Sequence, residues 1–213
     1  MSAPRHHPQP LSANGMDAAE IARRLTAARG ASPIGTERAG DRPASPWPAA
    51  VLLPLIRQEE AWHLLFIRRA EYAHDRHSGE VAFPGGRAEP GDADPVATAL
   101  REAREEIGLE PSMVQVLGRL PALLTVSNFL VTPVVGHVRW PLRLRPDPRE
   151  VAELFSLPLD WLSVPGNRQT RAWPSETHPK VRDVIFYEAY QGQRLWGVSA
   201  RITVDFLHCL GAC

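Results

Sequence analysis

The chain has 213 residues, and its 24 lysine and arginine residues balance its 24 aspartate and glutamate residues. Hydrophobic residues make up 44% and charged residues 23%, which is ordinary for one globular domain with room for a real core. Because the balance is neutral, we expect no broad electrostatic binding to nucleic acid or to a membrane surface. No apolar run approaches the roughly 20 residues that span a bilayer, and the N-terminus has no apolar signal core.

The two cysteines, Cys209 and Cys213, both lie in the last five residues. No disulfide framework is visible, so the pattern favours a reducing cytoplasm. Together with His208 they would make a poor metal site, since all three candidate ligands lie at a chain end.

The N-terminal 48 residues are predicted to be a tail that carries one short helix. Ile21 and Leu25 are four residues apart and Gly30 is a natural stop, so a helix is predicted over residues 16–29. Residues 30–48 are rich in proline and glycine, which indicates a linker. The folded domain is predicted over residues 49–213.

Strands and one strong helix follow in the first half of that domain. Apolar runs at 49–56 and 62–69 flank a polar segment and predict a hairpin. A short strand at 80–83 is predicted to stop at Pro84-Gly85-Gly86. Residues 94–107 predict a helix, because Asp94 can cap it, Pro95 suits its first position and Gly108 can end it.

The second half is predicted to add strands at 114–120 and 130–138, and a short helix within 151–162 that Pro158 breaks. A strand at 183–190 is predicted to pair with 194–196 across a glycine turn, before a closing helix at 199–210. Strands before and after one strong helix, with another helix at the end, indicate a layered α/β domain.

Three carboxylates dominate the central helix. Glu102, Glu105 and Glu106 stand at i, i+3 and i+4, so they share one helix face away from the apolar stripe. Carboxylates this close repel one another unless a cation lies among them, and hard ions such as Mg²⁺ or Mn²⁺ bind such oxygen clusters. The three glutamates alone would favour a solvated helix face over a metal site.

The residues around the helix strengthen the metal hypothesis. Gly85 and Gly86 allow backbone conformations closed to other residues, and a carbonyl of that turn could complete the metal shell. Arg101 stands next to the carboxylates and could pair with Asp92 or Glu89, which would fix the loop against the helix.

Residues 86–109 resemble the Nudix box, commonly written G-x5-E-x7-R-E-U-x-E-E-x-G-U with U aliphatic. The segment departs from that pattern at three points: Asp92 replaces the first glutamate, the next spacer has eight residues, and Ala103 is a small U. The resemblance implies a Nudix-type α/β/α sandwich with a mixed central sheet, and a hydrolase that uses Mg²⁺ or Mn²⁺. It assigns Glu102, Glu105, Glu106 and Gly86 to the metal.

The flanking segments resemble the coenzyme A pyrophosphatases of the Nudix superfamily. The resemblance lies in residues 65–70 with 76–86, in 131–136, in 150–159 and in the irregular box itself. It implies hydrolysis of coenzyme A or a derivative to 3′,5′-ADP and 4′-phosphopantetheine. The predicted substrate-binding set has seven residues, Arg69, Arg76, His77, Phe83, Gly85, Gly86 and Ser127, although a turn between strands explains Ser127 as well.

Mechanistically, the resemblance predicts in-line attack of water on phosphorus, with a carboxylate as base. Glu105 and Glu150 are both candidates for the base, and Arg101 completes the predicted catalytic set. A small-molecule substrate, a cytoplasmic location and, as an option, a homodimer are the remaining expectations.

Three alternatives stay open at this point. The first is a Nudix hydrolase for another substrate, such as NADH, ADP-ribose or a damaged nucleotide. The second is a catalytically silent nucleotide-sensing module, although such modules usually lose one of the three glutamates. The third is a binding protein built around residues 2–48, whose proline- and alanine-rich composition is better explained as a linker.

Overall fold

The computed structural model describes residues 13–28, 45–72, 78–175 and 178–212. Its centre is an eight-stranded mixed sheet in which β3, β2, β1, β7 and β5 are successive neighbours, while β4, β6 and β8 pair with β1, β7 and β2. β1 and β7 run parallel, and the other pairs in this sheet are antiparallel. The strands are β1 (Trp47–Gln58), β2 (Ala61–Arg69), β3 (Val81–Ala82), β4 (Gly85–Arg87), β5 (Val114–Arg119), β6 (Leu123–Leu124), β7 (Phe129–Val138) and β8 (Val151–Pro158).

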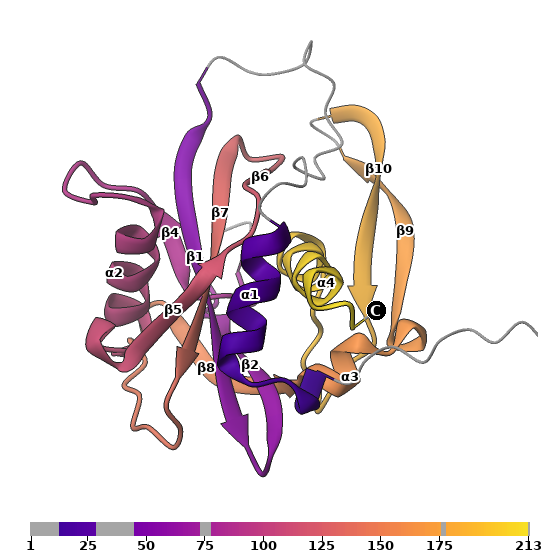
Figure 1. Cartoon of the computed structure of the whole chain (residues 1–213). Helices are drawn as coiled ribbons and strands as arrows, with labels where there is room; N and C mark the ends of the chain where they lie inside the picture. The colour runs from indigo at the N-terminus through magenta and orange to yellow at the C-terminus, as the bar shows by residue number, and fades with distance from the viewer. Residues whose placement is uncertain (1–12, 29–44, 73–77, 176–177, 213) are drawn as a thin grey trace, which may run out of the picture.

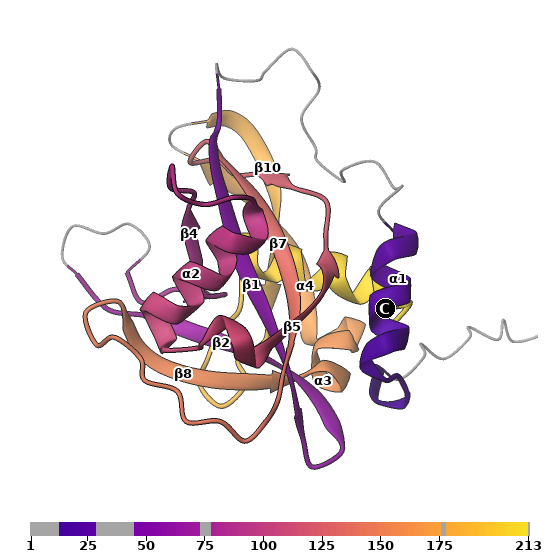
Figure 2. The same ribbon diagram turned by 60° about the vertical axis from the view of Figure 1, so that its left-hand side comes forward.

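Helices cover both faces of this sheet (Figure 1, Figure 2). One face packs on α2 (Pro95–Ile107), and the other packs on α1 (Ala18–Ala28) and α4 (Gly197–Leu210). A two-stranded sheet of β9 (Arg168–Ser175) and β10 (His178–Tyr187) lies beside α4 (Figure 1). The shorter helices are η1 (Ala13–Gly15), η2 (Pro111–Met113), α3 (Leu159–Ser163) and η3 (Pro165–Asn167). The predicted α/β/α sandwich with a mixed central sheet is confirmed.

Side chains alternate along β2, which explains why the sheet has a hydrophobic core on each of its faces. Leu64 and Phe66 face the α1 and α4 side, whereas Leu65 and Ile67 face α2, and all four side chains are buried. Successive residues of a strand point to opposite faces, so one apolar strand serves both layers. This is why β1 and β2 are almost continuously hydrophobic. It also determines that Arg68 and the next residue point to different sides of the sheet.

Helix α1 is part of the folded core. Ile21 and Leu25 are completely buried, and a Cβ added to Gly118 of β5 would lie 3.0 Å from the Cβ of Leu25. The backbone of Met16 also accepts a hydrogen bond of 2.8 Å from the indole Nε1 of Trp62. The predicted helix is therefore present, and it packs against the domain that begins at β1. The predicted linker falls mostly on residues 29–44, outside the described part of the chain.

Truncation of Leu25 tests how much helix α1 contributes to the stability of the fold. Leu25→Ala should lower the free energy of unfolding by about 2–4 kcal/mol, because a fully buried leucine leaves a cavity against β5. Urea denaturation of the purified protein measures the change. Arg23→Ala is the matched control, since the Arg23 side chain is 76% exposed. Equal stability of the two variants would mean that α1 adds no packing energy.

Two predicted elements differ from the structure. The segment predicted to hold a broken helix is strand β8 up to Pro158, followed by the short helix α3. Its apolar residues are locally compatible with a helix or a strand, and pairing with the edge of β2 stabilises the strand.

The C-terminal hairpin was predicted only in part. The antiparallel bridges Phe186–Trp196 and Tyr190–Gln193 connect the two predicted segments across the glycine turn, but the main partner of β10 is β9, which was not predicted. β9 gave no hydrophobic signal because its residues 169–172 are exposed.

Candidate active site

Helix α2 carries the carboxylates, and its ends are well defined. The Asp94 carboxylate accepts a hydrogen bond of 2.9 Å from the Ala97 amide, which caps the first turn. Gly108 ends the helix in the left-handed region at φ 66°. Ala99, Ala103 and Ile107 are completely buried against the sheet. This packing sets the rotation of the helix, so the glutamates lie along its side toward β4.

Strand β4 brings two glycines against those glutamates. The sequence predicted a turn here, but Gly85 and Gly86 pair with Val51 and Ala50 of β1. The Gly85 amide donates a hydrogen bond of 2.9 Å to Oε2 of Glu106. A Cβ on Gly86 would lie 2.6 Å from Oε1 of Glu102. A side chain at position 86 would displace the Glu102 carboxylate, whereas a Cβ at Gly85 would lie 2.4 Å from the Ala50 carbonyl oxygen, so glycine is required at Gly85.

Arg101 connects the loop before the helix to the helix itself. Its guanidinium donates to both oxygens of Asp92 at 3.1 and 3.0 Å. It also donates to Glu102 at 2.9 Å, to Glu105 at 3.0 Å and to the carbonyl of Arg87 at 3.0 Å. The predicted pairing of Arg101 with Asp92 is therefore present, and one side chain holds the loop, β4 and two carboxylates in register.

Asp92 has further partners that the sequence interpretation missed. Its Oδ2 accepts hydrogen bonds of 2.9 Å from the Glu89 amide and from Oγ1 of Thr98. The Arg101 guanidinium is the main reason that the pKa of Asp92 lies well below its usual range, and the Glu89 amide adds to the effect. Thr98 is completely buried, and its position four residues before Glu102, on the carboxylate side of α2, was the available signal for its role. Asp92 is shorter than the glutamate of the Nudix pattern, and the spacer after it is one residue longer. The hydrogen bonds of Asp92 nevertheless close the loop.

Removal of the Asp92 carboxylate tests the loop. Asp92→Ala should cost about 2–3 kcal/mol of unfolding free energy and lower activity, because the Arg101 guanidinium loses its bidentate partner. Chemical denaturation and a turnover assay on the same samples measure both effects. Glu89→Ala serves as the control, since its carboxylate is 65% exposed and lies 3.8 Å from Arg101. A cost as small as that of the control would contradict the role given to Asp92.

Glu106 lies in an electrostatically unfavourable position. Its side chain is only 3% exposed, and burial is the main cause that raises its pKa to about 8. The Gly85 amide and Arg69 lower this pKa, whereas Glu102 and Glu150 raise it. Burial also raises the pKa of Glu102, with Glu105 and Glu150 adding to the rise. Several carboxylates therefore share a region in which Arg101 and Arg69 only partly offset the effect of burial.

This donor set fits a hard divalent cation. Burial raises the pKa values of Glu102 and Glu106, which lie next to a glycine backbone. A positive charge between the two carboxylates would stabilise their ionised forms. Across the described ranges, no group of three acidic, histidine or cysteine side chains is already arranged around one point. Arg101 accounts for part of this, because it holds Glu102 and Glu105 by hydrogen bonds. Metal ligation by Glu102, Glu105, Glu106 and Gly86 stays a prediction.

Two other predicted residues lie near these carboxylates. Arg69 ends β2 and acts electrostatically on Glu106. Glu150 immediately precedes β8 and acts on both Glu102 and Glu106. The preceding loop is fixed to the end of α2, because the Asp147 amide donates 2.8 Å to the carbonyl of Glu106. The fold thus brings residues far apart in the sequence to one place.

The remaining predicted substrate residues lie elsewhere or outside the described chain. Phe83 is 3% exposed and stacks on Phe66 with ring centroids 4.5 Å apart, so its side chain belongs to the core. Ser127 is exposed in the turn between β6 and β7, where its hydroxyl lies 3.0 Å from that of Thr125. Arg76 and His77 lie outside the described residues.

The chain matches a family of known proteins. The NUDIX domain model matches residues 46–180. The Nudix hydrolase NudL of Pectobacterium atrosepticum is 44% identical over 155 residues, covering 72% of this chain and 78% of that protein. NudL of Yersinia pestis strain Pestoides F is 40% identical over 156 residues, covering 72% and 75%. The chain belongs to the Nudix family.

A solved structure agrees with this fold. The MutT/nudix family protein from Enterococcus faecalis has a TM-score of 0.51 and 15% identity, and the match covers 78% of this chain and 62% of that one. At this identity the likeness concerns the fold alone. Nudix hydrolases act on small pyrophosphate-containing substrates and generally use divalent metal ions, so this chain is a hydrolase of that kind.

Proposed function

We propose that the protein hydrolyses the pyrophosphate bond of coenzyme A or one of its derivatives. The products would be 3′,5′-ADP and 4′-phosphopantetheine or its acyl form. The observation that carries the proposal is the flank of the box, residues 65–70 and 76–86, which resembles coenzyme A pyrophosphatases. The described part of that flank contributes directly to the carboxylate site, since Arg69 and the Gly85 amide both act on Glu106. Residues that resemble a substrate signature therefore act on a carboxylate that we propose to be catalytic.

Glu102, Glu105 and Glu106, with the Gly86 backbone, would hold Mg²⁺ or Mn²⁺. When bound, such an ion neutralises charge on the phosphate oxygens and lowers the pKa of a coordinated water. Arg101 keeps Glu102 and Glu105 in place through its hydrogen bonds. The Gly85 amide orients the Glu106 carboxylate from the other side. These contacts are made before substrate arrives, which limits the reorganisation needed during the reaction.

Glu150 is our proposed general base. Its carboxylate is exposed and makes no side-chain hydrogen bond or ion pair within the part of the chain that the structure describes, yet it lies close enough to raise the pKa of Glu102 and Glu106. Glu105, the other candidate, is held by Arg101 at 3.0 Å. The Arg101 guanidinium thus occupies one oxygen of Glu105, whereas no described side chain donates to the Glu150 carboxylate. Glu150 would take the proton of the attacking water while the bridging P–O bond breaks.

Product analysis tests the substrate. After incubation with coenzyme A and Mg²⁺, we expect 3′,5′-ADP and 4′-phosphopantetheine in equal amounts, separated by anion-exchange chromatography. Turnover of NADH, ADP-ribose and oxidised nucleotides should be lower at equal concentration. Formation of no 3′,5′-ADP would overturn the substrate while leaving the family membership intact. Absence of turnover with every substrate and Mg²⁺ or Mn²⁺ would instead favour the nucleotide-sensing alternative.

The remaining expectations concern the surroundings of the enzyme. No helix among the described residues is long and apolar enough to cross a bilayer. A cytoplasmic location, the absence of a nucleic-acid partner and a homodimer stay predictions. Light scattering of the purified chain measures the oligomeric state, and a mass near 24 kDa would contradict the dimer.

A further inference from the structure

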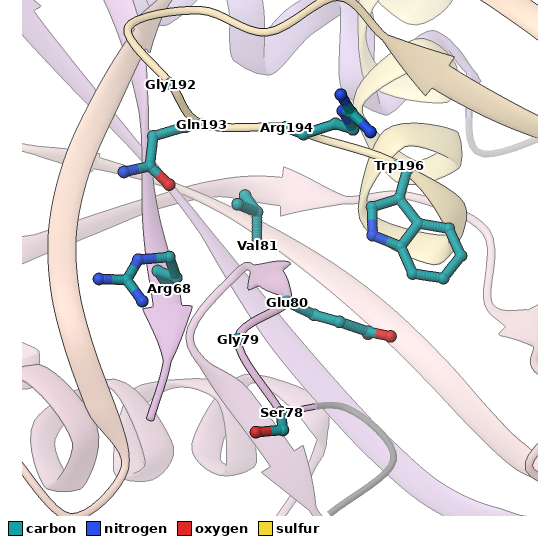
Figure 3. Close-up of a pocket in the computed structure, with 9 residues that line it drawn as sticks. All are labelled: Arg68, Ser78, Gly79, Glu80, Val81, Gly192, Gln193, Arg194 and Trp196. Atoms are coloured by element: carbon teal, nitrogen blue, oxygen red, sulfur yellow. The ribbon is translucent and has the colours of Figure 1, made fainter. Parts of the chain in front are cut away.

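A cavity on the side of the sheet opposite α2 has a lining that fits part of an extended substrate (Figure 3). Its volume is about 490 Å³, and it lies between the end of β2, the start of β3 and the segment that leads into α4. One wall is formed by Arg68 and residues 78–81, and the other by residues 192–194 with Trp196. Figure 3 shows the side chains of Arg68 and Gln193 on one side of Val81, with Glu80 and Trp196 on the other.

Trp196 offers an aromatic surface that is held rigidly. Its indole stacks on the ring of Phe186 with centroids 5.6 Å apart and planes 5° apart. The guanidinium of Arg171 lies 5.3 Å from the centroid of the same Phe186 ring. Trp196 is half-buried and still lines the cavity. A braced aromatic ring at a cavity wall suits stacking with a nucleobase, which has a π-face of matching size.

Arg194 supplies a positive charge that the described protein does not neutralise. Its side chain is exposed, and it makes no hydrogen bond or ion pair with any residue in the ranges that the structure covers. Arg68, by contrast, lies 3.4 Å from Glu153 and 3.6 Å from Glu71. Gln193 is also held, because its Nε2 donates 2.8 Å to Glu153. Arg194 is thus the cation of this cavity with capacity for an added phosphate.

The cavity lies within reach of the carboxylate site. Val81 lines the cavity and Gly85 donates to Glu106, with three residues between them. Four residue steps span at most roughly 14 Å, so this wall of the cavity lies within that distance of the Gly85 backbone. A dinucleotide-like molecule is long enough to occupy both.

We propose that this cavity binds the nucleoside end of the substrate, with Trp196 stacking on the base and Arg194 pairing with a phosphate on the ribose. This inference rests on the proposed function, because coenzyme A carries such a phosphate at the 3′ position. The two ends of the substrate differ in charge. The pantetheine arm is neutral and offers Arg194 no partner, whereas the phosphorylated ribose does. The cavity would thereby select coenzyme A over analogues that lack the 3′ phosphate.

Kinetics with paired substrates provide the first test. For Arg194→Gln, kcat/KM should fall about tenfold more for coenzyme A than for 3′-dephospho-coenzyme A, mainly through KM, because one charge-assisted contact is lost. Arg139→Gln is the matched control, since Arg139 is likewise exposed but follows β7 beside another cavity. It should keep the wild-type ratio. An Arg194→Gln enzyme with the wild-type ratio between the two substrates would overturn the proposal.

Binding of the reaction product provides a second test that does not depend on turnover. Calorimetry with 3′,5′-ADP and with 5′-AMP should show tighter binding of the bisphosphate to the wild-type protein, and Arg194→Gln should remove most of that difference. Trp196→Phe should weaken both nucleotides less than Trp196→Ala does. If 4′-phosphopantetheine binds and loses affinity in these variants while 3′,5′-ADP does not, the cavity holds the other end and the proposal is wrong. Product analysis with wild-type enzyme separately decides the proposed function.

Discussion

Glu106→Gln should lower turnover at least about 100-fold while leaving the fold intact. Glutamine keeps an oxygen that can accept the hydrogen bond from the Gly85 amide, but it removes the negative charge. The substitution therefore takes away a ligand for the divalent ion without creating a cavity. Steady-state kinetics at saturating Mg²⁺ measure the loss, with Glu110→Gln as a control because Glu110 is exposed beyond the end of α2.

Thermal unfolding with and without metal separates this effect from damage to the structure. With EDTA, the glutamine variant should be as stable as the wild type or more stable, because it no longer buries a carboxylate beside Glu102 and Glu150. Addition of Mg²⁺ should raise the Tm of the wild type clearly and that of the variant much less. A variant that keeps both its turnover and its metal-dependent rise in Tm would exclude Glu106 as a ligand.

The metal-free wild type should also show a specific dependence of stability on pH. Burial raises the pKa of Glu106 in the folded protein to about 8, from an ordinary value of 4.5. The folded state then holds a proton that the unfolded state has released, so stability falls as pH rises between these two values. Glu106→Gln should make the curve flatter in EDTA over that range. Identical curves for both proteins would contradict the buried carboxylate.

Glu150→Gln should lower kcat by about 10²- to 10⁴-fold, which is the usual contribution of a general base. KM and the Tm increase caused by Mg²⁺ should change little, because we assign Glu150 to proton transfer and not to the ion. The logarithm of kcat for the wild type should rise with pH and level off, and this rise should disappear in the variant. If Glu150 only supported the loop before β8, its substitution would not lower kcat and remove the pH dependence while leaving KM and the Tm increase unchanged.

Glu105→Gln is the matched comparison on the helix. Its carboxylate is paired with Arg101 and half exposed, so we expect a smaller fall in kcat and a change in the Mg²⁺ concentration needed for half-maximal activity. If Glu105→Gln instead loses kcat with an unchanged metal requirement while Glu150→Gln stays active, the base is Glu105. Either result assigns the proton acceptor that the sequence left undecided.

The sequence by itself determined the local elements around the site. The cap at Asp94, the apolar stripe and Gly108 define α2, and the spacing of its glutamates follows from helical geometry alone. These features depend on residues close together in the chain, which is why they could be predicted. The family and the sandwich architecture followed from the same local patterns.

Only the tertiary structure decided what these elements contact. The approach of Glu150 to Glu102 and Glu106 depends on the loop that docks on the end of α2, about 40 residues further along the chain. β8 is a strand because it pairs with the edge of β2. Phe83 follows β3, and the alternation of side chains along that strand directs its ring into the core against Phe66. Such pairings join distant residues, and no local pattern encodes them. Residues 86–109 could therefore be recognised from the sequence, whereas their electrostatic surroundings were set by the fold.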